Sequence, residues 1–252
     1  MRFVRLIVLS AMVAAPETIA AARQFSEVEI LPSRNRFPVF SADPLMPSFS
    51  VQKIFGSDDL IAKFGATIPL IALQAHGLPA QVAVAGAAIP FLQSPGGGLR
   101  VVSTDFHFFA GASLSWSPEF SCRLGYGHTS HHLNDDAIVR TPALVPLNYA
   151  RDYLSADGVL FIPSWHGLVY WGINYAFQFQ AAARDPKPVW ILFGGVPTKV
   201  QLFDSCSLYC AFNLRFRQEF QFAATQNYQL GIEFTSQDGR MVRRVGLADR
   251  QR

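Results

Sequence analysis

Chemically active side chains are densest between residues 125 and 136, where the chain reads Gly-Tyr-Gly-His-Thr-Ser-His-His-Leu-Asn-Asp-Asp. His128 and Ser130 are two positions apart, so they lie on one face wherever the backbone is extended. A serine beside a histidine can attack an acyl group, because the imidazole takes the hydroxyl proton and a carboxylate orients the imidazole. The spacing does not decide among three candidate acids, which are Asp152, taken first, Asp135 and Asp136.

The same stretch contains side chains that bind metal ions. Imidazole and carboxylate groups are common ligands, and the metal candidates are His131, Asp135 and Asp136, with His128 and His132 nearby. Neighbouring residues of a strand point to opposite faces, so at most two or three of these side chains converge unless the chain turns. The simplest interpretation is a rim of hydrogen-bonded side chains at a strand end, where an Asn-Asp pair favours a turn.

The elements that must position these side chains are extended strands. Between residues 167 and 180, apolar side chains occupy every odd position from Val169 to Phe179, whereas the even positions from 170 to 180 hold Tyr, Gly, Asn, Ala and Gln. Residues 102–116 and 208–222 alternate in the same way. A period of two is typical of a strand with one apolar and one polar face.

Length and composition favour strands that cross a membrane. Half of the chain is hydrophobic and only 15% is charged, where soluble proteins have about 25%. Membrane strands need roughly nine to eleven residues, and globular strands run to about five or six. A soluble β-sandwich is the alternative, but its strands would be shorter and their outer faces richer in Lys and Glu. The expected fold class is therefore all-β, a closed antiparallel transmembrane β-barrel of about ten strands, with twelve also open because such counts are even.

The predicted strands and the chain ends divide the sequence into four regions. Three prolines between residues 66 and 92 exclude a membrane helix there and favour two strands. Strands are expected at 49–55, 60–74, 80–92, 99–116, 118–132, 148–160, 166–181, 188–203, 207–223 and 226–235. The regions are a signal peptide at 1–22, an irregular Pro-rich lead-in or partial plug of the lumen at 23–47, the barrel at 48–235, and an Arg-rich disordered tail at 236–252.

Three stretches resemble a known family. Residues 128–136 resemble the His-x-Ser-Ser-His-Leu-Gly-Asp-Glu motif of domain-of-unknown-function family 1207, a set of Gram-negative envelope proteins expected to be barrels. Residues 37–44 are similar to its Phe-Pro-x-x-x-Ala-Asp-Pro signature, and residues 148–152 to the strand after its histidine motif. The resemblance implies an envelope barrel and carries no established activity. The motif departs from the family pattern at His131, Asn134 and Asp136.

The function expected from these patterns is that of an outer-membrane β-barrel of a Gram-negative bacterium, either a structural envelope protein or a narrow channel. The alternative is an acyl hydrolase, because the His-x-Ser arrangement is similar to that of the lipid A 3-O-deacylases. Expected partners are outer-membrane lipid, lipopolysaccharide and the barrel-assembly machinery; the oligomeric state stays open. The net charge of +3 is too small for nucleic acid, and no cofactor motif is present. The residues expected to line the lumen are Arg123, Arg215, Arg217 and Glu219.

Overall fold

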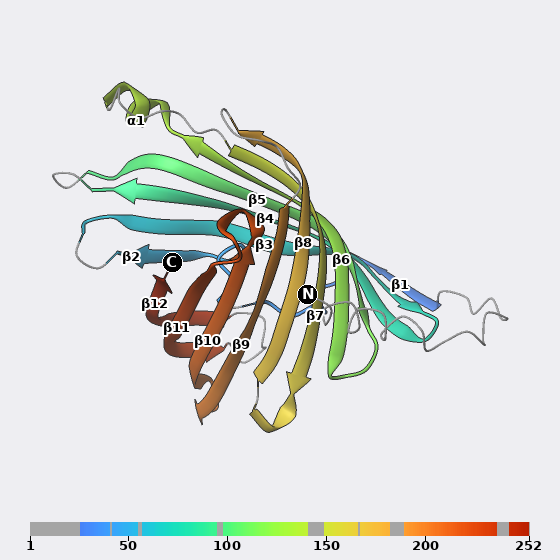
Figure 1. Ribbon diagram of the computed structural model, residues 1–252. Helices are drawn as coiled ribbons and strands as arrows, with labels where there is room; N and C mark the ends of the chain where they lie inside the picture. The colour runs from blue at the N-terminus through green and yellow to red at the C-terminus, as the bar shows by residue number, and fades with distance from the viewer. Residues whose placement is uncertain are drawn as a thin grey trace.

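The structure, a computed structural model, describes residues 26–40, 42–54, 57–94, 98–140, 149–165, 167–181, 189–235 and 242–251. These residues form one antiparallel sheet of twelve strands, which twist and curve together in Figure 1. The predicted signal peptide at 1–22 lies outside the described residues. No helix in the described part is long and apolar enough to cross a membrane.

Each strand of the sheet pairs with its neighbour in the sequence, except at the amino-terminal edge, where β1 and β2 both pair with β3. A short helix, α1 (Asp135–Arg140), follows β6. The strands are β1 (Ser26–Ile30), β2 (Ser50–Lys53), β3 (Leu60–Ala75), β4 (Leu78–Gln93), β5 (Arg100–Ser115), β6 (Phe120–Leu133), β7 (Tyr149–Ile162), β8 (Gly167–Ala181), β9 (Val189–Phe203), β10 (Cys206–Arg217), β11 (Ala224–Thr235) and β12 (Val242–Gln251).

All ten predicted strands are confirmed as β2 to β11, and the strand number is twelve, the count left open beside ten. The sheet has twelve strands because one forms at each end of the chain. β1 lies in the region predicted to be an irregular lead-in, and β12 lies in the tail predicted to be disordered. The tail is ordered over 242–251 because its backbone pairs with the edge of β11 from Thr235 to Gln226, and an edge strand tolerates arginine.

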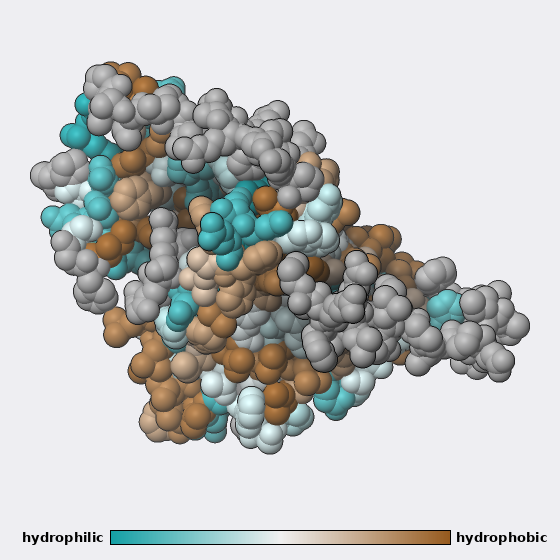
Figure 2. Space-filling model, in the orientation of Figure 1, coloured by the Kyte–Doolittle hydropathy of each residue, from teal (hydrophilic) through white to brown (hydrophobic). Residues whose placement is uncertain are grey.

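The two faces of the long strands differ in the way that the alternation predicts. β3 to β5 have 16 residues each, and the odd residues of β5, β6, β7 and β10 face the opposite way from the even ones. Large apolar side chains lie exposed on the outer face, including Phe106, Phe108, Leu124, Leu154, Trp171, Ile173, Trp190, Leu230 and Phe234. Brown hydrophobic residues likewise gather over the end of the β9–β10 hairpin, low in Figure 2. Polar side chains are buried on the inner face, including His107, Asp157, Asn174, Asn213 and Arg215.

The sheet is strongly curled. Lys63 on β3 donates hydrogen bonds to the carbonyl oxygens of Pro44 and Met46, and Arg215 on β10 binds the Asp43 carboxylate. β3 and β10 are seven steps apart in the strand order, which in a flat sheet is roughly 34 Å at about 4.8 Å a step. Both strands nevertheless contact the same four-residue segment. Among the described residues no ladder joins β12 to β1, β2 or β3, so the sheet is curled but its two edges are not paired.

Residues 31–49, described except for residue 41, are called the plug here, and its buried side chains Phe37, Phe40, Ala42 and Asp43 pack against the inner face. Phe40 is fully buried and stacks on Tyr170, with ring centroids 4.1 Å apart. Phe37, Val159 and Phe193 complete this core. Buried residues of the predicted lead-in or partial plug therefore lie against the sheet.

Glycines let large inner side chains cross from strand to strand. Tyr170 on β8 lies opposite Gly195 on β9, which lies opposite Asn213 on β10. The Asn213 amide reaches across the glycine and donates to the Tyr170 hydroxyl at 2.9 Å. A Cβ atom at Gly195 would lie 2.1 Å from the Phe212 carbonyl oxygen and 2.5 Å from the Tyr170 hydroxyl. Position 195 therefore has no room for a side chain.

We predict that Gly195→Ala lowers the free energy of unfolding by about 1–3 kcal/mol, because the backbone oxygen of Phe212 cannot move without disturbing the ladder. Denaturant unfolding in detergent micelles measures the change. Gly98→Ala is the matched control, since a Cβ atom there meets nothing within 4 Å. Equal stability of the two variants would contradict the packing of Tyr170 over Gly195.

Candidate functional site

The first candidate site lies on the outer face of β6 and β7. His128 and Asp152 are directly opposed in the ladder, so their side chains share a face and meet. His128 Nδ1 lies 2.6 Å from Asp152 Oδ1, and the Tyr126 hydroxyl donates to the same oxygen at 2.7 Å. Leu124, on the same face of β6, is 65% exposed. The carboxylate thus holds an imidazole and a phenol in place beside an apolar surface.

Ser130 lies on this face two residues after His128, near the end of β6. Its hydroxyl oxygen is 3.1 Å from His132 Nε2, and the His132 ring meets the edge of Phe106 at 5.5 Å. The structure therefore brings His128 and Asp152 together, while the hydrogen bond of Ser130 is with His132. The cluster consists of two pairs that do not share an imidazole.

Sequence reasoning assigned His132 only to the metal hypothesis and gave Tyr126 no role. Strand parity was the available guide, because positions 126, 128, 130 and 132 all lie on one face. Parity alone does not choose between the two histidines that flank Ser130. That choice depends on side-chain rotamers, which the sequence does not specify.

The metal candidates do not assemble. His131 Nδ1 lies 2.5 Å from Asp105 Oδ1 on β5, and Asp135 is the first residue of α1. The side chain of Asp136 is outside what the structure describes. Within the described part of the chain, no three His, Cys, Asp or Glu side chains converge to hold a metal ion. The contact between His131 and Asp105 joins two strand ends, as the rim interpretation expects.

The outer-face cluster, Tyr126, His128, Ser130, His132 and Asp152, lies toward the rim of the sheet that has the longer connections. Residues 134–148 link β6 to β7 at this rim, and residues 94–99 link β4 to β5. At the opposite rim, β3 and β4 are separated only by residues 76–77, and β9 and β10 only by residues 204–205. The two rims are therefore unequal, and the cluster belongs to the long-loop rim.

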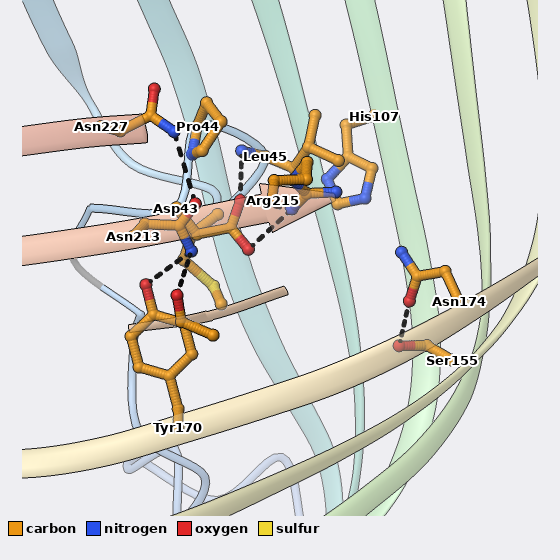
Figure 3. A network of polar contacts seen from close by, with 12 residues as sticks. Asp43, Pro44, Leu45, His107, Ser155, Tyr170, Asn174, Asn213, Arg215 and Asn227 are labelled. Atoms are coloured by element: carbon orange, nitrogen blue, oxygen red, sulfur yellow. Dashed lines mark hydrogen bonds and ion pairs between the residues drawn. The ribbon is translucent and has the colours of Figure 1, made fainter. Parts of the chain in front are cut away.

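The second candidate site is the polar network on the inner face. Arg215 Nη2 lies 2.8 and 3.0 Å from the two carboxylate oxygens of Asp43, and the Leu45 amide donates to the same carboxylate at 2.9 Å. Figure 3 shows this group beside Asn213, which donates to Tyr170 and accepts from Asn227. Both charged side chains are at most 6% exposed. A buried charge needs such a partner, because an unpaired one is very costly.

A second ion pair lies next to the first. Arg123 Nε donates to Asp157 Oδ2 at 2.8 Å, and Ser155 donates to the other oxygen of Asp157 at 2.6 Å. The Arg123 guanidinium lies over the Phe37 ring of the plug and the Phe109 ring of β5, at 4.4 and 4.3 Å. This arginine therefore pairs with the wall and also supports the plug.

Other charges of the inner face pair within the wall of strands or at its rim, whereas Lys63 contacts the plug. Arg151 and Arg217 bind Glu219, and Lys199 binds Glu233. The expectation that Arg123, Arg215, Arg217 and Glu219 face inward agrees with these contacts. A cavity of about 40 Å³ remains between wall and plug, room for a few water molecules. Its lining includes Asp43, His107, Arg123, Asn174 and Arg215.

No protein-family model, no curated protein and no solved structure matches the chain. Its function is therefore inferred from the geometry of the two candidate sites. One is a polar cluster on an apolar outer face, and the other is a charged inner face that a segment of the same chain covers.

We predict that Asp157→Ala lowers the free energy of unfolding by about 3–5 kcal/mol, because it leaves the Arg123 guanidinium buried without its carboxylate. Denaturant unfolding in micelles measures this. Asp58→Ala removes a carboxylate whose pair with Lys53 is largely exposed, so it should cost less than about 1 kcal/mol. A small effect at both positions would mean that water reaches the inner face and solvates the Arg123 guanidinium.

Proposed function

We propose that the chain is an outer-membrane β-barrel of a Gram-negative bacterium, closed by its own amino-terminal plug. The observation that carries this proposal is the division of the faces, with large apolar side chains outside and charged pairs inside. Lipid accepts the first kind of surface and excludes the second, as transmembrane barrels require. A soluble sheet would have the opposite arrangement.

Closure of the barrel supplies partners for the two edges of the sheet. Unpaired backbone groups are too costly in hydrocarbon, so a membrane sheet must join its ends. The plug already contacts both β3 and β10, and twelve is an even count, as is usual for bacterial barrels. We propose that β12 pairs with the edge formed by β1 to β3 in the bilayer.

The plug makes a structural envelope protein or a closed narrow channel the better-supported role. Phe37, Phe40 and Asp43 are all buried on the inner face, where an open channel would have water. These residues belong to the stretch 37–44 on which the resemblance to family 1207 rests. Long loops face the outside of the cell in such barrels and short turns face the periplasm, so the proposed partners of the long-loop rim are outer-leaflet lipid and lipopolysaccharide. Insertion would use the barrel-assembly machinery.

We predict that the protein without residues 1–22 inserts into lipid vesicles and migrates in a folded, faster form on SDS gels unless it is boiled. Closed hydrogen bonding protects the barrel from detergent, and the folded form should show β-type circular dichroism. Planar bilayers containing this protein should show no lasting conductance. A protein that stays dissolved without detergent, or that does not float with vesicles, would contradict the proposal.

A second candidate function is acyl hydrolysis of an outer-leaflet lipid, and the contact between Ser130 and His132 favours it. In this proposal the Ser130 hydroxyl attacks the ester carbonyl and passes its proton to His132 Nε2. The imidazole then returns the proton to the departing alcohol, and water releases the fatty acid from Ser130. His128 and Asp152 lie alongside, where they can bind polar groups of the lipid.

We predict that protein in lipopolysaccharide-containing micelles releases fatty acid, and that Ser130→Ala lowers the rate by at least about a hundredfold. His132→Gln should lower the rate more than His128→Gln does, because only His132 contacts the serine. Thr129→Ala is the matched control, since it lies on the opposite face of β6. Release that is absent, or unchanged in Ser130→Ala, would exclude the hydrolase and leave the barrel proposal intact.

A further inference from the structure

The positive side chains of the inner face differ in where their partners lie. In the part of the chain that the structure describes, Asp157 and Glu233 of the wall and Glu219 at its rim each bind a Lys or Arg of the wall, and Asp105 contacts His131. Two cations have their polar partners in the plug instead. Arg215 binds the Asp43 carboxylate, and Lys63 donates to the carbonyl oxygens of Pro44 and Met46.

We propose that Lys63 and Arg215 form an anion site in the lumen, that Asp43 of the plug occupies this site, and that displacing the plug opens a path selective for small anions. The inference rests on the proposed barrel, because only a closed wall in a membrane can conduct. It assigns a substrate class, small inorganic or carboxylate anions, to a lumen that the plug keeps shut.

The contacts of Asp43 are those of a ligand in a site. Its carboxylate receives Arg215 through both oxygens, at 2.8 and 3.0 Å, and receives the Leu45 amide at 2.9 Å. It is 6% exposed, so little water competes for it. Lys63 fixes the next residues at 2.8 Å from the Pro44 oxygen and 3.3 Å from the Met46 oxygen. An anion from solution offers the same oxygens or an equivalent charge.

The plug is also attached in a manner that permits displacement. Away from Asp43, its polar contacts with the wall include Gln81, which accepts from the Arg36 amide and donates to the Arg34 carbonyl oxygen. No covalent bond holds it there, because all three cysteines are free. When the plug leaves, Lys63 and Arg215 stay on opposite parts of the wall without a carboxylate. Positive side chains in a pore attract anions and repel cations.

The test uses the whole protein with its plug, because loss of the Asp43 charge alone should release the plug. In Asp43→Asn the side chain keeps its size but loses the charge that Arg215 and Lys63 hold. We expect the fraction of time spent open in planar bilayers to rise at least about tenfold over the wild type, and the reversal potential in a potassium chloride gradient to show chloride preference. Asp58→Asn is the matched control, since it changes net charge equally at an exposed pair with Lys53.

Two further variants make the result decisive. Lys63→Gln should also open the barrel, with a weaker chloride preference that Arg215 still supplies, and it replaces Asp43→Asn if that variant does not insert. Asp43→Asn with Arg215→Gln should stay open and lose much of its chloride preference. Inserted variants that remain as closed as the wild type, or that open with cation preference, overturn the anion path and leave the barrel standing. Failure of the wild type to float with vesicles overturns both.

Discussion

A charged side chain that is removed from water needs a partner of opposite charge. The pair of Arg215 and Asp43 meets this constraint and joins the plug to the wall of strands. The two residues are 172 positions apart, so their contact can form only after β10 has been built and the sheet has curled. The same contact anchors the plug, which brings Phe40 onto Tyr170 and the next residues onto Lys63. This buried pair therefore links the curled wall to the plug that fills its interior, and the proposed closed state depends on it.

The two faces of the wall obey opposite rules, and each rule limits the kind of function that can be there. Inside, tyrosine and asparagine interlock over glycines such as Gly195, arginines pair with carboxylates, and a cavity of about 40 Å³ lies between wall and plug. Outside, apolar side chains dominate, and a polar cluster is an exception. In a membrane such an exception is expensive and therefore suggests a function, which is why the group around Asp152 is the best place for chemistry in this chain.

The two proposals can be separated because they use different faces. Substitutions at Ser130 or His132 leave the plug contacts intact, and substitutions at Asp43 or Lys63 leave the outer cluster intact. The proposed barrel is common to both, since a closed wall in a membrane would give one face lipid and the other a lumen. A closed barrel of twelve strands would enclose more space than side chains of the wall fill by themselves, and the plug would take up that space.

The sequence by itself determined the strands and their faces. Alternation is a local property with a period of two, so ten strands and the outward position of Leu124 or Trp171 could be read from the residues alone. It did not show β12, because a segment rich in arginine is typical of a solvated tail. The backbone of this segment forms a strand only where the edge of β11 offers hydrogen-bond partners.

Only the tertiary structure decided which side chains meet across strands. The contact of His128 with Asp152 follows from the register of β6 on β7, and no local pattern contains a register. The link between Ser130 and His132 depends on rotamers, and the link between Asp43 and Arg215 depends on curvature. The sequence pattern predicts on which face of a strand a side chain lies. The partner of that side chain depends on the register and curvature of the folded sheet.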